Sequence, residues 1–356
     1  MSEIKVLDFN YGKEFEYEQY KSGSFPSHSF YGMIELEKKG YEVKYVSTSR
    51  KSGIKGIINN TRLILNSKCN ILFCSYIYIM PLLGIALLKN IGLCRTIKII
   101  GISHTSFHDD YSFINRLICK FVYRAFDRIF FHSLKNMEEG AATGILKPDK
   151  LKLLHWGVDL NYLDETISSN ENKTDYFIST GREYRDFPVL ISSFSQTNLD
   201  LKIYTNKTNY ENNYEFLSEF ENKYPNIEIK FVTRNKETAI HLVNLTAESF
   251  CVVIPLQKEA SYYCVGHTSI VEALALGKPI IASANDYHPI DVEKEHVGIK
   301  IKSLDPSEWI KAIIYLSEHK EEAKIMGENG KKLAREKYNI EVCANEILDS
   351  IKYLSR

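Results

Sequence analysis

Residues 266–283 constrain the fold of this chain more than any other stretch. Their pattern predicts a turn, a helix of about three turns that ends at Gly277, and a buried strand that follows Pro279. A helix start carries free backbone N–H groups and the positive end of the helix dipole, so it attracts anions. This one opens with small and polar residues that leave room for a diphosphate: Gly266, His267, Thr268 and Ser269.

Glu272 lies about one turn inside the predicted helix. From there its carboxylate can accept hydrogen bonds from paired hydroxyl groups such as those of a ribose. An ordinary strand–helix unit explains the same pattern, with Ser269 as the helix cap and Glu272 as its capping-box partner. The pattern alone leaves both interpretations open.

The order of residue types favours the binding interpretation. Residues 266–279 have the form Gly-His-Thr-Ser-x-x-Glu-Ala-x-Ala-x-Gly-Lys-Pro. This resembles the donor-binding segment of GT-B glycosyltransferases and is most similar to glycosyltransferase family 4, also called glycosyl transferases group 1. The resemblance implies that amides at the helix start hold the diphosphate of a nucleotide-sugar and that Glu272 holds its ribose.

A second stretch, residues 176–187, ends a buried strand with Gly181 and Arg182 and brings Arg185 three positions later. Two guanidinium groups at the carboxyl end of a strand suit a diphosphate. The stretch is similar to the family segment in which Gly-Arg and a later Lys or Arg clamp the donor phosphates and neutralise the departing nucleotide without a metal. The alternative is a pair of surface arginines that pair with the acidic residues beside them.

His104 and His108 follow a strand predicted at 97–102. The resemblance implies that His104 faces the cleft of a GT-B enzyme and touches the transferred sugar. The spacing of both histidines with Asp109 and Asp110 also permits a metal site, whereas helix capping is the more ordinary role for the two aspartates.

Ser27 and His28 end a long polar and aromatic loop, residues 11–27, before a helix predicted at 29–39. Some inverting GT-B enzymes carry a general base near this position, so both residues are candidates on the acceptor side. Helix capping is the alternative role.

Cys264 stands where family 4 has a second carboxylate, eight positions before Glu272. The loop 258–266 therefore has to hold the donor sugar differently, which leaves the sugar and the stereochemical outcome open. We expect the nucleotide base near residues 232–234, where Thr233 follows the third strand of the second domain.

Short β-branched or aromatic runs alternate with helical patterns along the chain, which predicts an α/β protein with two doubly wound, Rossmann-like domains. Strands are predicted near 4–9, 42–46, 70–74, 97–102, 128–132 and 151–154, then 176–179, 200–205, 227–232, 250–254 and 279–283. We expect the GT-B architecture: an acceptor-side domain at 1–165, a hinge around 163–175, a donor-binding domain at 174–338, and a C-terminal helix, 339–356, that crosses back to the first domain.

Lys plus Arg and Asp plus Glu both number 45, so the chain has no net charge with which to attract nucleic acid. Seven cysteines without a CxxC pair predict unpaired core residues in a reducing compartment. The first residues lack a charged head followed by an apolar segment, which favours a cytoplasmic protein over a secreted one.

Residues 49–68 place five basic residues around apolar positions. Such a helix can rest on an anionic membrane next to a lipid-linked acceptor. The alternative is a helix whose apolar stripe covers the sheet and whose basic face meets water.

Together these features predict a hexosyltransferase-type glycosyltransferase of polysaccharide biosynthesis, retaining and independent of metals and cofactors. It would move a sugar from a nucleoside-diphosphate sugar to a glycan, glycolipid or other acceptor. The alternatives are a sugar-nucleotide 2-epimerase or hydrolase on the same scaffold, and a non-catalytic nucleotide-sugar-binding subunit.

Overall fold

The computed structural model describes residues 4–48, 53–104, 112–167, 174–208, 212–233, 235–258 and 264–356. The chain forms two compact units: unit 1 combines Met1–Trp156 with Ile340–Arg356, and unit 2 is Gly157–Asn339. The division at Gly157 comes before the hinge expected around 163–175, part of which lies outside the described residues.

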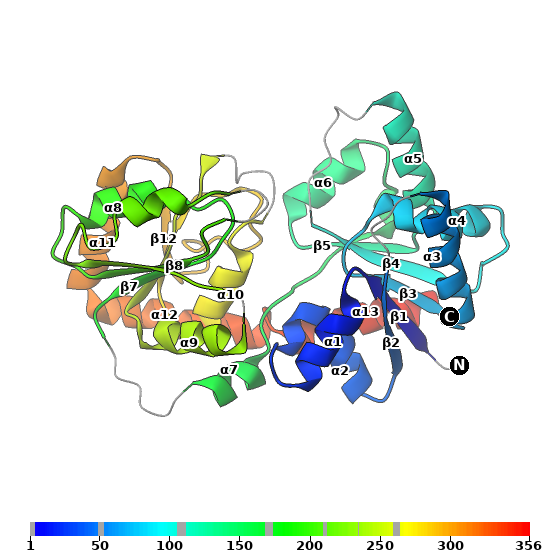
Figure 1. Cartoon of the computed structure of the whole chain (residues 1–356), viewed down its shortest axis with the longest axis horizontal. Helices are drawn as coiled ribbons and strands as arrows, with labels where there is room; N and C mark the ends of the chain where they lie inside the picture. The colour runs from blue at the N-terminus through cyan, green and yellow to red at the C-terminus, as the bar shows by residue number, and fades with distance from the viewer. Residues whose placement is uncertain are drawn as a thin grey trace. The chain divides into compact units, whose positions relative to one another are not determined.

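Unit 1 contains a six-stranded parallel sheet in the order β2-β1-β3-β4-β5-β6 (Figure 1). Each strand lies within one residue of its predicted bounds, because every strand is a short apolar run bounded by turn residues. The strands are β1 Lys5–Asn10, β2 Glu42–Ser47, β3 Ile71–Cys74, β4 Lys98–Ser103, β5 Arg128–Phe131 and β6 Leu151–Leu153.

Helices α3, α4 and α5 connect successive strands and cover one face of this sheet. Right-handed crossovers put them on the same side, and their inner residues form one core with alternate strand residues such as Leu7, Leu72 and Ile99. Helix α13 packs on α2, which belongs to the crossover from β1 to β2. The helices of unit 1 are α1 Lys13–Lys21, α2 Met33–Lys38, α3 Ile54–Asn66, α4 Ile79–Asn90, α5 Phe113–Arg124, α6 Leu134–Ala142 and α13 Ile340–Leu354, with 3-10 turns η1 Ser27–Phe30 and η2 Pro148–Lys150.

The connection between β1 and β2 differs from the prediction. The expected loop at 11–27 contains helix α1, whose Tyr17 ring stacks on Tyr45 at 4.2 Å. The expected helix at 29–39 is broken at Tyr31 and Gly32, which both have positive φ. A Cβ on Gly32 would lie 2.7 Å from the Cα of Ala344, so this break lets α13 approach closely.

The C-terminal helix belongs to unit 1, as the fold prediction requires. The Nζ of Lys39 pairs with Glu341 at 2.9 Å and donates to Asn345, and His155 pairs with Glu346 at 2.7 Å. These contacts join residues about 190 to 300 positions apart along the chain, so α13 completes the unit that the first half of the chain begins.

Unit 2 contains a second six-stranded parallel sheet in the order β12-β11-β10-β7-β8-β9. Its strands are β7 Phe177–Thr180, β8 Leu201–Thr205, β9 Ile227–Phe231, β10 Cys251–Ile254, β11 Ile280–Ser283 and β12 Gly298–Ile301. Its helices are α7 Leu160–Thr166, α8 Phe187–Phe194, α9 Lys236–Glu248, α10 His267–Ala275, α11 Pro306–Glu318 and α12 Lys320–Glu336, with a 3-10 turn η3 Glu215–Glu219.

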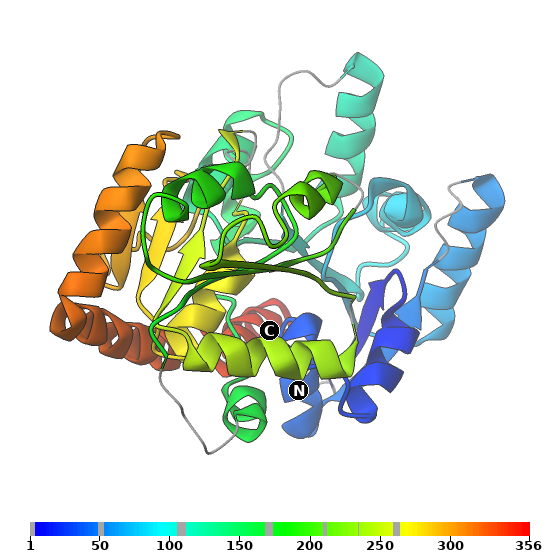
Figure 2. The same ribbon diagram turned by 60° about the vertical axis from the view of Figure 1, so that its left-hand side comes forward.

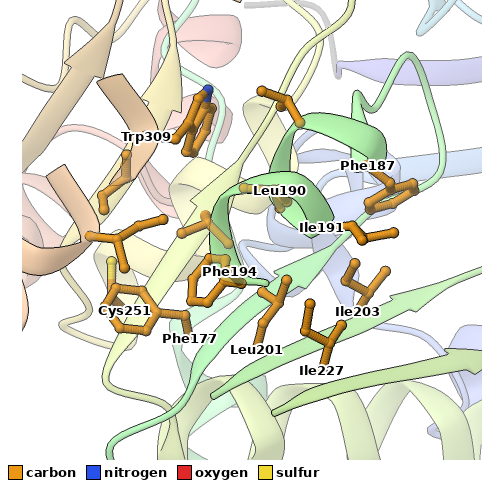
Figure 3. Close-up of a cluster of buried hydrophobic side chains, with 14 of the residues drawn as sticks. Phe177, Phe187, Leu190, Ile191, Phe194, Leu201, Ile203, Ile227, Cys251 and Trp309 are labelled. Carbon is orange, nitrogen blue, oxygen red and sulfur yellow. The ribbon is translucent and has the colours of Figure 1, made fainter. Parts of the chain in front are cut away.

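The core of unit 2 is aromatic. Phe177 of β7 meets Phe194 of α8 edge-on, with ring centroids 5.3 Å apart, and Trp309 of α11 is fully buried in the same cluster (Figure 3). These large side chains fix α8 and α11 on one face of the sheet, and with them the loop that leads from β7 into α8.

Two elements of unit 2 depart from the sequence pattern. The helix expected at 211–223 is only the short turn η3, and Asn222 has a left-handed backbone at φ 62° that a continuous helix does not allow. Strand β12, which the pattern does not predict, pairs along the edge of β11. In the part of the chain that the structure describes, no helix is long and apolar enough to cross a bilayer.

Candidate functional site

The sheet of unit 2 reverses its strand order between β7 and β10. The chain adds β8 and β9 on one side of β7, and β11 and β12 on the far side of β10. Ligands of doubly wound sheets bind at this reversal, beyond the carboxyl ends of the strands. The loops that follow these two strands carry the two sequence motifs, so the fold brings Gly181 and Arg185 to the start of α10.

Helix α10 begins without a side-chain cap. Its N-cap is Gly266 at φ 85°, and the first helical residue is His267. Ser269 is therefore inside the helix, and the interpretation of Ser269 as the cap is wrong. Among the described residues, no side chain caps this helix start by a hydrogen bond, which is the arrangement that favours a bound anion.

The hydroxyl of Ser269 ties α10 to the neighbouring strand. It donates to the carbonyl oxygen of Thr180 and accepts from Nη2 of Arg185, both at 3.2 Å. A single hydroxyl thus links the end of β7, the helix start and the second motif arginine.

Arg185 is held rigidly and is only 3% exposed, so it is not a surface arginine. Its Nη1 donates to the carbonyl oxygen of Glu183 at 2.7 Å, and its backbone N–H donates to the hydroxyl of Tyr214 at 2.8 Å. Its own carbonyl oxygen accepts from the side chain of Gln257. A buried guanidinium fixed in this way is preorganised for an anion.

Gly181 makes room for this guanidinium. It has φ 143°, and a Cβ there would lie 2.5 Å from Nη2 of Arg185. A Cβ on Gly266 would lie 3.9 Å from Nη1, which is ordinary contact. Any larger residue at Gly181 would push the arginine away from the start of α10.

Arg182 and Glu272 complete this group. Arg182 is exposed and Glu272 is half-buried. Burial raises the pKa of Glu272 to about 7, although the charge of Arg182 opposes this rise. Glu272 therefore exchanges a proton near neutral pH, and hydroxyl donors or an added positive charge would favour its ionised form.

The other predicted donor residues lie at two places. Thr268 is exposed on the first turn of α10, whereas His267 is buried against His288, with ring centroids 5.1 Å apart. The N–H of His267 already donates to the carbonyl oxygen of Cys264. Thr233 is exposed beyond the end of β9, two strands from β7 and so roughly 10 Å along the sheet edge.

A cavity of about 350 Å³ adjoins the start of α10. Val265 and Ile270 line its apolar side, and the loop after β11 supplies Asn285, Asp286 and His288. Its size and its mixture of apolar and polar walls are typical of small-molecule pockets.

Unit 1 has its own reversal of strand order, between β1 and β3. Asn10 at the end of β1 donates from Nδ2 to the hydroxyl of Ser75, which follows β3, at 2.8 Å. The carbonyl oxygen of Ser75 in turn lies 2.8 Å from Nε2 of His104, which follows β4. Three adjacent strand ends are therefore joined by hydrogen bonds.

His104 is neutral near pH 7, because burial lowers its pKa to about 4. A carbonyl oxygen can only accept, so Nε2 carries the proton and Nδ1 is left as an acceptor. The ring stacks on Tyr76 with centroids 4.1 Å apart, and His132 lies 5.3 Å away. A neutral imidazole of this kind can accept from a hydroxyl but is a weak base.

Tyrosines that the sequence motifs do not predict surround His104. Tyr76 and Tyr78 are each 42% exposed, and Tyr11 meets Tyr78 edge-on at 4.5 Å. The hydroxyl of Tyr31 lies 3.0 Å from that of Tyr76. The run Tyr-Ile-Tyr directly after a strand was the available signal. Together these four residues form an aromatic cluster at the strand ends.

Ser27 and His28 are buried in η1. The indole N–H of Trp156 donates to the carbonyl oxygen of His28 at 2.9 Å. Neither residue caps a long helix, since α2 begins only at Met33, after Gly32. The capping interpretation is therefore wrong. Both side chains are buried in unit 1.

The structure describes only part of the alternative metal site, namely His104. His108, Asp109 and Asp110 lie outside the described residues, as does Arg234 beside the predicted base position. Among the residues that are described, no three His, Cys, Asp or Glu side chains gather closely enough to hold a metal ion.

Comparisons with known proteins give a family match within unit 2 and a fold for the whole chain. Residues 168–333 match the family model "Glycosyl transferases group 1". That range contains both motifs of unit 2. No curated protein sequence matches the chain significantly.

Solved structures share the fold over the whole chain at low identity. HepE of Anabaena in complex with UDP and glucose is 14% identical, with a TM-score of 0.69 over 98% of this chain and 99% of that one. A glycosyltransferase of Rickettsia africae is 13% identical, with a TM-score of 0.71 over 99% of both chains. A putative UDP-N-acetylglucosamine 2-epimerase of Listeria monocytogenes is 14% identical, with a TM-score of 0.60 over 99% and 96%. The chain therefore has the two-domain GT-B fold of these proteins.

Proposed function

We propose that the chain is a glycosyltransferase that moves a sugar from a nucleoside-diphosphate sugar to a saccharide-containing acceptor. One observation carries the proposal: the buried guanidinium of Arg185 is fixed beside the uncapped start of α10, at the strand reversal of unit 2. A UDP-sugar is the first donor to test, since the fold neighbour HepE binds UDP.

In the proposed donor site, four groups bind the nucleotide: the first-turn amides of α10, Arg185, Arg182 and Glu272. The first-turn amides of α10 and Arg185 hold the diphosphate, and Arg182 approaches it from the exposed side. Glu272 accepts hydrogen bonds from the ribose hydroxyls. As the bond to the sugar breaks, negative charge builds on the departing diphosphate, and the two arginines with the helix dipole stabilise it. We therefore propose transfer without a metal.

Unit 1 is proposed to bind the acceptor. The aromatic cluster Tyr11, Tyr31, Tyr76 and Tyr78 offers flat apolar faces beside hydroxyl groups, which suits a sugar ring with its alternating C–H and O–H groups. His104 is proposed to accept a hydrogen bond from the transferred sugar through Nδ1. Such a role orients the sugar without removing a proton, in keeping with a retaining reaction.

The reaction is proposed to take place in the cytoplasm. All seven cysteines are free thiols, and five of them are buried. Unpaired cysteines are typical of proteins in a reducing compartment.

The test is a transfer assay with a panel of isotopically labelled nucleotide-sugars and a mixture of oligosaccharide and glycolipid acceptors, read by mass spectrometry. We expect label to move to a saccharide acceptor with release of the nucleoside diphosphate. Arg185→Ala should abolish this transfer, while Lys202→Ala, on β8, should not. A labelled product that remains a nucleotide-sugar of changed configuration would instead favour the epimerase, and no turnover of any nucleotide-sugar would contradict the proposal.

A further inference from the structure

The neutral total charge of the chain conceals a strongly basic segment. Residues 43–126 contain twelve Lys or Arg and only two acidic residues, Asp109 and Asp110, which gives this segment a formal charge of +10. The remainder of the chain carries the opposite charge. The segment contains the three helices α3, α4 and α5 that cover one face of the sheet in unit 1.

The same segment also holds most of the exposed apolar surface. Of the 21 large hydrophobic side chains that are exposed in the described part of the chain, 13 lie between residues 43 and 126, which is less than a quarter of its length. Scattered exposed hydrophobic residues are ordinary, but such a concentration marks an interaction surface.

Helix α3 carries apolar residues on two faces. Asn60 and Ile64 are buried toward the sheet, so the helix does cover the core. Ile54, Ile58 and Leu65 are exposed, and their spacing of four and seven residues places them on one outer face. Covering the sheet therefore accounts for only part of the apolar surface of α3.

Helix α4 continues this surface. Met80, Leu87 and Ile91 are exposed at spacings of seven and four residues, which again form a single outer stripe. Helices α3 and α4 pack closely at Gly84 of α4. A Cβ on this residue would lie 2.1 Å from the hydroxyl of Thr61 of α3. The outer stripes of α3 and α4 are thus neighbours.

Helix α5 adds three more exposed apolar residues. Phe113 is 76% exposed and Ile114 and Leu117 follow it, all within its first two turns. Lys120 and Arg124 lie seven and eleven positions after Phe113, so they share its face. In Figures 1 and 2 the three helices lie side by side in unit 1, and α4 packs against both of the others.

We propose that the outer surface of α3, α4 and α5, called the docking face below, binds an anionic lipid bilayer. The apolar side chains of the three helices enter the interface between headgroups and acyl chains, and the surrounding lysines and arginines pair with lipid phosphates. The protein lies on the membrane without crossing it. This goes beyond the sugar-transfer proposal and needs neither donor nor acceptor for its test.

Charge decides the occupant of the docking face. A second copy of the chain would meet it with the same patch in a two-fold dimer, which would bring two segments of +10 together. Asp127 pairs with Lys89 and Glu42 pairs with Lys44, which removes two of these charges. Between Ile54 and Arg124, the described residues include no Asp or Glu that could offset the rest. An anionic bilayer supplies both the negative charge and the apolar depth that this surface requires.

The test is flotation of the purified full chain with two kinds of vesicle, phosphatidylcholine alone and phosphatidylcholine mixed with phosphatidylglycerol. We expect the protein to float with the anionic vesicles, to remain behind with the neutral ones, and to be released by salt. Phe113→Ser should weaken binding about tenfold, since one aromatic side chain leaves the interface. Lys120→Ala should weaken it about fivefold.

Matched controls come from α12 in unit 2. Ile325, which is 56% exposed, and Lys324 beside it provide Ile325→Ser and Lys324→Ala, which should leave flotation unchanged. Urea unfolding of each variant checks that the fold is intact. Equal recovery with both kinds of vesicle, equal effects of the α5 and α12 variants, or a dimer in sedimentation that Phe113→Ser dissociates would each overturn the proposal.

Discussion

Gly181→Ala tests the donor site without altering any side chain that would touch the nucleotide. The new Cβ would lie 2.5 Å from Nη2 and 2.7 Å from Nε of Arg185, well inside contact distance. Arg185 is only 3% exposed and its Nη2 donates to the hydroxyl of Ser269, so we expect the new Cβ to displace the guanidinium from that hydroxyl. The substitution should therefore displace the side chain of Arg185 without replacing that residue.

Two terms set the size of this effect. Alanine at φ 143° costs about 1–3 kcal/mol of stability, because this backbone region suits only glycine. Displacing the guanidinium removes a hydrogen bond to a charged phosphate, worth about 1.5–3 kcal/mol of binding free energy. We expect UDP to bind roughly 10- to 150-fold more weakly.

Isothermal titration calorimetry with UDP measures the binding loss, and urea unfolding measures the stability loss. Gly40→Ala is the matched control, since Gly40 has φ 86° and nothing within 4 Å of its would-be Cβ. It should lose stability but keep UDP affinity. In an Arg185→Ala background, Gly181→Ala should weaken UDP binding little further, because both changes remove the same interaction. Unchanged UDP affinity in folded Gly181→Ala would refute the reasoning.

Three further predictions concern other groups. Glu272→Ala should weaken UDP binding by about 1.5–3 kcal/mol in calorimetry, the cost of lost hydrogen bonds to a charged group, and unchanged affinity would remove the ribose assignment. His104→Ala should lower the rate of sugar transfer roughly 10²- to 10³-fold with UDP affinity near normal, and a larger loss in His28→Ala with an inverted product by NMR would transfer the principal role to His28. Burial raises the pKa of Asp8 to about 6 from 3.8, so its protonated form stabilises the fold fully below about pH 4, and this contribution of about 3 kcal/mol is lost as the pH rises through about 6. Urea unfolding should therefore show Asp8→Asn gaining about 3 kcal/mol relative to the native protein between about pH 4 and about pH 7.5, and a difference that does not depend on pH would contradict this.

The strands were the most predictable part of the fold. Parallel strands buried on both faces are continuous apolar runs, such as Ile71–Cys74 and Cys251–Ile254, and turn residues bound them sharply. Helix α13, Ile340–Leu354, lies within two residues of the predicted bounds 339–356 at both ends, because its apolar spacing is strongly periodic. Strand β12 was missed because its four residues gain their stability from pairing with β11 rather than from their own pattern.

The break between η1 and α2 could not be predicted from local sequence. Residues 29–39 have a helical pattern, but the left-handed backbone at Tyr31 and Gly32 is imposed by α13, which lies about 300 residues later in the chain. Tertiary packing overrode local propensity at this point.

The two motifs of unit 2 could be located from the sequence because each has a distinctive order of residue types on one strand end, and their role in donor binding stays a prediction. The contacts that hold Arg185 were not, since Tyr214 and Gln257 come from distant loops with no signal of their own. The aromatic cluster around His104 was missed for a similar reason: its four tyrosines follow β1, η1 and β3, and only the fold brings these three segments together.

The central claim is that unit 2 binds a nucleoside diphosphate through Arg185 at the start of α10. Calorimetric titration of the native chain and Arg185→Ala with UDP, GDP, ADP and dTDP, each beside its monophosphate, tests it most directly. We predict that one diphosphate binds, that its monophosphate binds at least tenfold more weakly because it lacks the second phosphate, and that Arg185→Ala removes this difference. Equal affinity for monophosphate and diphosphate, or an Arg185→Ala variant that still distinguishes them, would contradict the claim.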